Sequence, residues 1–213
     1  MTRIKICGIT SINDAICASE CGADALGFVF YPKSPRHIDI KKAASIMKEL
    51  PPFINRAGLF VNPFNEEIFK VLDSCDIDII QLHGNESPEF CEGLPKRVIK
   101  AIRIKDASTL NLISKYNNCS GILLDTFSSY SYGGTGKTFS WDMAKEVSKK
   151  RSIILAGGLN EKNIKNAIIE VKPYGVDISS GVESSPGRKD YKKIKNFITI
   201  VRMTDYEDRE KFI

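Results

Sequence analysis

The chain has 213 residues, of which 42% are hydrophobic and 27% charged, as expected for a globular protein of one or two domains. Its net charge of +5 comes from Lys and Arg residues scattered along the chain, whereas a nucleic-acid binder usually carries a basic stripe. No apolar run approaches the roughly 20 residues that cross a bilayer, and the opening "MTRIKICGIT" lacks the apolar core of a signal peptide. We therefore expect a cytoplasmic protein that binds neither nucleic acid nor membrane.

Short apolar runs rich in Ile, Val and Phe recur along the chain and predict strands. In chain order they are "RIKIC" (3–7), "ALGFVF" (25–30), "RAGLFV" (56–61), "DIIQLH" (78–83), "VIKAIRI" (98–104), "GILLDT" (121–126), "SIILAGG" (152–158) and "GVDISSG" (175–181). Segments of helical periodicity separate them, such as 39–50 and 65–75. This alternation predicts an α/β fold, a single-domain (β/α)8 TIM barrel over residues 1–203. The alternative, an open doubly wound sheet, usually has fewer strands at this length.

Reactive side chains stand at the carboxyl ends of these runs, where (β/α)8 barrels carry their active sites. They include Cys7, His83 and Asp125. Alternation along a strand places Lys5 with Cys7, and Gln81 with His83, on one face. If these faces point to the barrel axis, Cys7 and Asp125 reach one ligand above it. From the residues alone, a small buried thiol and a turn cap are the simpler interpretations of Cys7 and Asp125.

A glycine-rich run at 133–138, "GGTGKT", ends like a nucleotide-binding P-loop. A P-loop needs a glycine five residues before Gly136, directly after a strand, but that position is Ser131 and the preceding strand ends well before it. We therefore predict a lid over the active site, in which the glycines let the backbone flex and Lys137 lies near an anion or at the surface.

Two further glycine-containing turns follow the seventh and eighth runs, where barrels commonly bind phosphate through backbone N–H groups and a short helix N-terminus. Gly157, Gly158 and Gly181 permit close approach of the backbone, and Ser180 adds a hydroxyl. Each turn alone is better explained as an ordinary tight turn. The two together predict a phosphate site.

The six cysteines form no CxxC pair, and His37 and His83 lack metal-ligand spacing, so we predict no metal site. Cys17 and Cys21, four residues apart in a predicted helix, are expected to be small buried thiols. The highly charged stretch 204–213 follows the last apolar helix. It is expected to be a frayed or solvated helix end, or a subunit contact, and the protein a monomer or a homodimer.

One motif at each predicted strand, in order from residue 3 to about 200, resembles the phosphoribosylanthranilate isomerase family. The motifs are "KICGIT" (5–10), "GFVFYPKSPR" (27–36), "GLFVN" (58–62), "QLHGNE" (81–86), "LLDT" (123–126), "GGTGKTF" (133–139), "LAGGLN" (155–160), and "GVDISSGVE" with "PGRKD" (175–190). Asn85 and Ser140 depart from the family's usual residues, and the tail after Met203 looks like an addition.

This resemblance implies an Amadori rearrangement of N-(5-phosphoribosyl)anthranilate to 1-(2-carboxyphenylamino)-1-deoxyribulose 5-phosphate, in tryptophan biosynthesis, with no metal or organic cofactor. Asp125 matches the family's general acid and Cys7 its general base. Arg36 matches the residue that binds the anthranilate carboxylate, for which a bidentate guanidinium is suited. The other residues expected to bind this phosphosugar are Gln81, His83, Gly157, Gly158, Asp177, Ser180 and Gly181.

Two of these side chains have a second possible role. His83 is either a supporting contact or a hydrogen-bonded core histidine, and Asp177 is one candidate partner for Lys5 in a buried ion pair. Desolvation at the barrel mouth is expected to raise the pKa of Asp125 from about 3.9, and Lys5 or a helix N-terminus to lower that of Cys7 from about 8.5.

Other phosphosugar barrels are rival interpretations. A ribulose-phosphate epimerase needs metal-binding His and Asp at its strand ends, and an indole-glycerol-phosphate synthase needs catalytic Lys and Glu and an N-terminal extension. A non-catalytic barrel that senses a phosphosugar is a rival of another class, which Cys7 and Asp125 disfavour. Activity on the related aminoaldose of histidine biosynthesis is left open.

Overall fold

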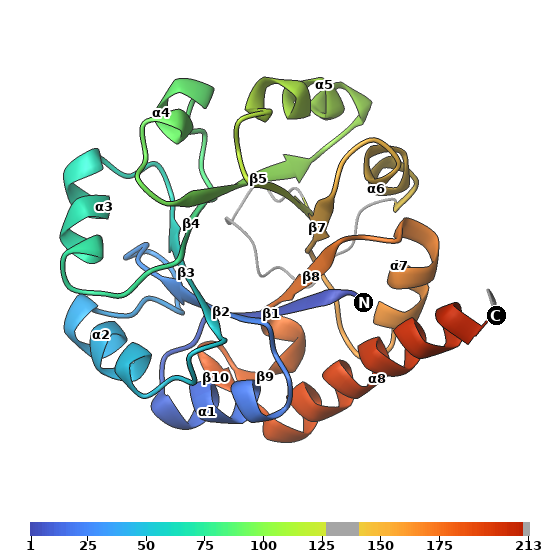
Figure 1. Ribbon diagram of the computed structural model, residues 1–213, viewed down its shortest axis with the longest axis horizontal. Coiled ribbons are helices and arrows are strands. Elements are labelled where there is room, and N and C mark those ends of the chain that lie inside the picture. The colour runs from blue at the N-terminus through green and yellow to red at the C-terminus, as the bar shows by residue number, and fades with distance from the viewer. Residues whose placement is uncertain (127–140, 211–213) are drawn as a thin grey trace.

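The computed structural model describes residues 1–126 and 141–210. In this part of the chain, parallel strands close into a barrel in chain order, with β8 pairing back onto β1 (Figure 1). The barrel strands are β1 (Arg3–Cys7), β2 (Ala25–Val29), β3 (Asn55–Phe60), β4 (Ile79–Leu82), β5 (Arg97–Ile104), β6 (Gly121–Thr126), β7 (Ile153–Leu155) and β8 (Gly175–Ile178). The predicted (β/α)8 barrel is confirmed, and the open doubly wound sheet is wrong because the sheet has no free edge.

Helices cover the outside of the barrel (Figure 1). They are α1 (Ile12–Glu20), α2 (Ile40–Lys48), α3 (Asn65–Leu72), α4 (Pro88–Glu92), α5 (Leu110–Ile113), α6 (Trp141–Ser148), α7 (Ile164–Val171) and α8 (Tyr191–Glu210), with short 3₁₀ turns η1 (Ala107–Thr109) and η2 (Ser114–Tyr116) flanking α5. The helices predicted at 39–50 and 65–75 are α2 and α3. Asp39 caps α2, because its side chain accepts the backbone N–H of Lys42. Cys17 lies in α1 and Cys21 caps its C-terminus, both as free thiols, but they are half-buried rather than buried as predicted.

The apolar core has two layers, one between strands and helices and one inside the barrel. Phe28, Ile68 and Phe197 are fully buried in the outer layer. Inside the barrel, a small cluster that includes Ile99 and Leu123 fills the interior. Because the interior is packed rather than hollow, polar side chains at the carboxyl ends of the strands stand above an apolar floor.

The segment after β8 holds elements that the periodicity does not predict. A 3₁₀ turn η3 (Ser180–Val182) leads into a two-stranded antiparallel hairpin of β9 (Glu183–Ser185) and β10 (Arg188–Lys189). Helix α8 then continues through residues 204–210 of the predicted tail. Thr204 is buried, and the Asp205 carboxylate accepts the backbone N–H and the hydroxyl of Thr2, each at 2.7 Å. This part of the tail is thus a helix end that Asp205 anchors to the start of the chain and that is largely exposed beyond it, with Tyr206 62% exposed, so the predicted solvated helix end holds for it while fraying does not.

The predicted lid, with Lys137 and the departure at Ser140, lies outside the described residues. Within the ranges that the structure does describe, no helix combines the length and the hydropathy needed to cross a membrane.

Candidate active site

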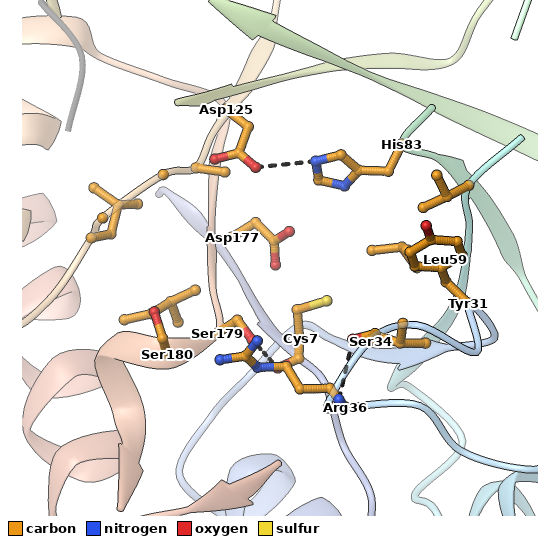
Figure 2. A pocket seen from close by; sticks show the side chains of 17 residues that line it. Cys7, Tyr31, Ser34, Arg36, Leu59, His83, Asp125, Asp177, Ser179 and Ser180 are labelled. Carbon is orange, nitrogen blue, oxygen red and sulfur yellow. Dashed lines mark hydrogen bonds and ion pairs between the residues drawn. The ribbon is translucent and has the colours of Figure 1, made fainter. Parts of the chain in front are cut away.

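A cavity opens at the carboxyl end of the barrel, and most of the predicted site residues line it (Figure 2). These are Cys7, Arg36, His83, Asp125, Gly157, Gly158, Asp177 and Ser180. In Figure 2, Asp125 lies above and Cys7 below the centre of the view, with Asp177 between them. Two predicted residues do not line the cavity. Gln81 is fully buried beside His83, and Gly181 packs against the neighbouring loop.

Cys7 is the last residue of β1, and β2 leaves room for its side chain. Gly27 is its partner across the strand pair. A Cβ on Gly27 would lie 2.7 Å from the Cys7 sulfur and 3.0 Å from Lys5 Nζ. Glycine at this position therefore lets the thiol and the ammonium group lie side by side, facing the barrel axis as predicted.

Lys5 forms the buried ion pair that the sequence suggested. Its Nζ lies 2.9 Å from both carboxylate oxygens of Asp177, its partner in the strand register between β1 and β8. Burial by itself lowers the pKa of Lys5, but the Asp177 carboxylate outweighs it, so the pKa lies above its ordinary value. Lys5 is thus a fixed cation and not a neutral amine.

The pKa of Cys7 is raised, which corrects the predicted lowering. Burial, the largest cause, disfavours the thiolate, and the neighbouring Lys5 opposes this effect without overcoming it. The prediction was wrong because it counted the cation and not the depth at which the thiol lies. The resting protein therefore holds Cys7 as a thiol.

Asp125, from β6, is oriented by a histidine from the end of β4. His83 Nε2 lies 3.0 Å from Asp125 Oδ2, and His83 Nδ1 lies 3.3 Å from the amide nitrogen of Gln81 (Figure 2 shows the first contact). All three side chains are buried. With the Gln81 amide N–H donating to Nδ1, His83 donates its Nε2–H to the Asp125 carboxylate. His83 thus contacts a site residue as well as lining the cavity.

Arg36 lies at the rim of the cavity, where the buried carboxylate of Glu183 binds its guanidinium group. Its Nε and Nη2 donate to the two carboxylate oxygens of Glu183 at 2.8 and 2.7 Å. The sequence predicted this bidentate geometry for a substrate carboxylate. In the structure, Arg36 makes this bidentate contact with Glu183 through Nε and Nη2. Only the edge of the guanidinium that carries Nη1 is left to bind a ligand.

The two glycine-containing turns lie against each other at the predicted phosphate site. Gly157 and Gly158 have positive φ values of 82° and 67°, and the side-chain amides of Asn160 and Asn163 donate to the Gly158 carbonyl. A Cβ on Gly181 would lie 2.1 Å from the carbonyl oxygen of Leu159. Glycine at position 181 therefore permits the close contact between the two loops.

Some residues of the cavity were not singled out from the sequence. Tyr31, Ser34 and Ser179 line it, and the Ser179 hydroxyl donates to the Cys7 carbonyl at 3.1 Å. Ser179 directly follows β8, so its position at a strand end was the available signal. Glu183 carries no such signal, because it lies beyond the strand end in the hairpin.

A family model described as N-(5'phosphoribosyl)anthranilate (PRA) isomerase matches residues 4–200. The chain belongs to the phosphoribosylanthranilate isomerase family. An N-(5'-phosphoribosyl)anthranilate isomerase of Pelobacter propionicus is 52% identical over 207 residues, which cover 97% of this chain and 99% of that one.

Crystal structures of phosphoribosylanthranilate isomerases share the fold. The Thermotoga maritima structure is 43% identical with a TM-score of 0.90, and covers 95% of this chain and 100% of its own. Another, solved in complex with reduced 1-(o-carboxyphenylamino)-1-deoxyribulose 5-phosphate, is 41% identical with a TM-score of 0.86 at the same coverage. These similarities favour this family over the epimerase and the synthase considered above.

Proposed function

We propose that the chain isomerises N-(5'-phosphoribosyl)anthranilate to 1-(2-carboxyphenylamino)-1-deoxyribulose 5-phosphate, a step of tryptophan biosynthesis. Membership of the isomerase family supports this reaction, as does the relative that binds a reduced form of the product. The observation that carries the proposal is the pair of Cys7 and Asp125, which face one cavity from different strands. The reaction moves the carbonyl function from C1′ to C2′ of the sugar, as an aldose–ketose isomerase (an intramolecular oxidoreductase) does.

The first step is ring opening, with Asp125 as the general acid. Its carboxyl group gives a proton to the ring oxygen while the bond between that oxygen and the anomeric carbon breaks, which leaves a Schiff base. His83 holds the carboxyl group through the 3.0 Å contact, and Gln81 acts on it only through His83. Proton transfer of this kind contributes about 10²–10⁴-fold to the rate.

The second step is proton abstraction, with Cys7 as the general base. The scheme starts from the minor form in which Asp125 carries the proton and Cys7 is a thiolate. This thiolate removes the proton from C2′ of the Schiff base, and the resulting enolamine tautomerises to the ketone. The proton that Cys7 has taken up passes through solvent to the Asp125 carboxylate before the next turnover. The neighbouring Lys5 stabilises the thiolate when it forms, against the burial that disfavours it. One acid and one base suffice for both transfers, so the scheme uses no metal ion and no organic cofactor.

Binding divides between the two ends of the substrate. Backbone N–H groups at Gly157, Gly158 and Gly181, with the Ser180 hydroxyl, bind the phosphate, and Arg36 pairs with the anthranilate carboxylate. Asp177 lies between Asp125 and Cys7. One of its carboxylate oxygens, which Lys5 contacts, accepts a hydrogen bond from a sugar hydroxyl. The support is the arrangement of these binding residues around one cavity (Figure 2), which all of them line except Gly181, the glycine packed against the neighbouring loop.

The quaternary state stays a prediction of monomer or homodimer, in the cytoplasm. A crystal structure of the Thermotoga maritima relative is described as containing monomers generated from a dimeric enzyme. Both states are therefore compatible with this barrel, and sedimentation of the purified protein distinguishes them.

Turnover of the substrate tests the proposal directly. Anthranilate and phosphoribosyl pyrophosphate, with the transferase that joins them, generate the substrate in place, and its fluorescence is followed after the purified protein is added. Borodeuteride then reduces the product ketone to a stable alcohol with deuterium at C2′, whereas it would reduce the Schiff base of unreacted substrate at C1′, and the fragment masses distinguish the two positions. Rapid loss of fluorescence with formation of that alcohol is expected. Binding without turnover would instead support a phosphosugar sensor.

A further inference from the structure

One buried carboxylate connects the proposed substrate-binding arginine to the strand that carries the proposed base. Glu183, the first residue of β9, contacts Arg36 through both oxygens, at 2.8 and 2.7 Å. Lys189 of β10 donates to one of the same oxygens at 2.9 Å. The side chains of Glu183 and Lys189 are only 4% and 1% exposed. Water therefore cannot replace Arg36 or Lys189 as a partner of the Glu183 carboxylate unless the hairpin moves.

Lys189 extends this contact to Cys7. Its Nζ donates to the Cys7 carbonyl at 2.5 Å and to the Ser179 carbonyl at 3.2 Å. Burial by itself raises the pKa of Glu183, but the hydrogen bonds from Arg36 and the charge of Lys189 outweigh it, so its pKa lies below the ordinary value. Glu183 is thus held as a carboxylate between two cationic side chains.

The stem of Arg36 is fixed by packing as well as by charge. Gly8 has φ of 80°, and a Cβ there would lie 2.6 Å from Arg36 Cδ. Gly187, at the turn of the hairpin, also has φ of 80°, and a Cβ there would lie 3.0 Å from the Pro35 carbonyl oxygen. The Thr10 hydroxyl donates to the Gly187 carbonyl at 2.5 Å. The loop after β1 and the hairpin turn therefore enclose Arg36 closely on two sides.

We propose that Glu183 is a specificity-determining positioning residue, which holds Arg36 so that its outer edge, Nη1 with the second N–H of Nη2, receives the aryl carboxylate of the substrate. This inference rests on the proposed role of Arg36. Glu183 takes up the Nε–Nη2 edge and so determines the direction in which the remaining edge points. Two cations around one carboxylate leave a net charge of about +1, which complements a single incoming carboxylate. Glu183 itself touches no substrate atom.

A clamp that merely held the hairpin in place would behave differently. Loss of such a clamp would weaken every ligand of the cavity, whether or not the ligand carries the aryl carboxylate. A positioning residue for Arg36 affects only ligands that carry it. The discriminating quantity is therefore the ratio of dissociation constants for two ligands that differ only in that group.

The experiment uses reduced 1-(2-carboxyphenylamino)-1-deoxyribulose 5-phosphate and the same compound made from aniline, which lacks the carboxylate. Calorimetry gives both dissociation constants for the wild-type protein, Glu183→Gln and Arg36→Met. Because a charge-assisted pair is lost, we expect Glu183→Gln to reduce the preference for the carboxylated ligand about tenfold, with binding of the other unchanged within about twofold. Ser184→Ala, a change in the same hairpin that leaves Glu183 intact, is the matched control and is expected to keep the wild-type ratio.

The outcomes separate the two proposals. An unchanged ratio in Glu183→Gln, or an equal weakening of both ligands, overturns the role of Glu183. A wild-type ratio in Arg36→Met overturns the role of Arg36 itself, on which the inference depends. If Glu183→Gln does not fold, Glu183→Asp replaces it in the experiment. Aspartate keeps the negative charge but is one methylene group shorter, so its carboxylate lies farther from Arg36. An intermediate ratio is then expected, and an unchanged one overturns the proposal.

Discussion

Replacing Cys7 by alanine tests the base with little disturbance to the fold. The thiol is buried at the end of β1, and the contacts from Lys189 and Ser179 go to the backbone carbonyl of residue 7, so alanine retains them. The change removes one buried sulfur atom. We expect it to lower the free energy of unfolding by only about 1 kcal/mol, in line with a small core truncation.

The expected loss of activity is far larger than this loss of stability. A positioned general base contributes about 10²–10⁴-fold, or about 3–5 kcal/mol of barrier. At pH 7, Cys7→Ala is therefore expected to lower kcat/KM by that factor in the fluorescence assay. Circular dichroism and the unfolding midpoint of the variant should stay close to those of the wild type.

The same variant isolates the titration of the thiol. Burial raises the pKa of Cys7, so the proton is held more tightly than in an ordinary thiol and the thiolate forms only at higher pH. The difference in absorbance at 240 nm between wild type and Cys7→Ala should therefore grow above the ordinary midpoint of about 8.5. A variant within tenfold of wild-type activity, or a midpoint below the ordinary value, would refute this reasoning.

Three further predictions address the phosphate loops, the barrel wall and the cofactor requirement. Gly181→Ala places a methyl group 2.1 Å from the Leu159 carbonyl, and by moving the two loops apart should lower kcat/KM about 10–100-fold, mainly through KM in steady-state assays. Lys100→Met leaves the buried Glu86, 2.8 Å from Lys100 Nζ, without its cation and should cost about 3–5 kcal/mol in urea unfolding. Activity should survive EDTA, because side chains make both proton transfers; a loss that added metal restores would contradict the scheme.

Local sequence patterns predicted the barrel and the residues at its strand ends. Alternation fixes which side chains face the axis, so Lys5 with Cys7, and Gln81 with His83, were placed on the faces that the structure shows. Strand order then brings Lys5 opposite Asp177, a pairing that the sequence offered as one candidate. These results depend on short-range periodicity together with the closure of one sheet.

The hairpin and its contacts could not be predicted in this way. Strands of three and two residues are too short for a periodic pattern, and Glu183 meets Arg36 across 147 positions of sequence. The pKa of Cys7 was missed for a related reason. Its direction depends on how completely neighbouring strands exclude water, which the cation Lys5 alone does not reveal.

The most direct test of the account compares wild type with Asp125→Asn in the fluorescence assay, without added metal. Asparagine has the shape of the aspartate and can still accept from His83 Nε2, so the barrel should remain intact, but it has no acidic proton to give. We predict rapid turnover by the wild type and a loss of about 10²–10⁴-fold in the variant, with the binding of the reduced product nearly unchanged. Asp125→Asn with near-wild-type turnover would contradict the assignment of the acid, and no turnover by the wild type would contradict the proposed reaction.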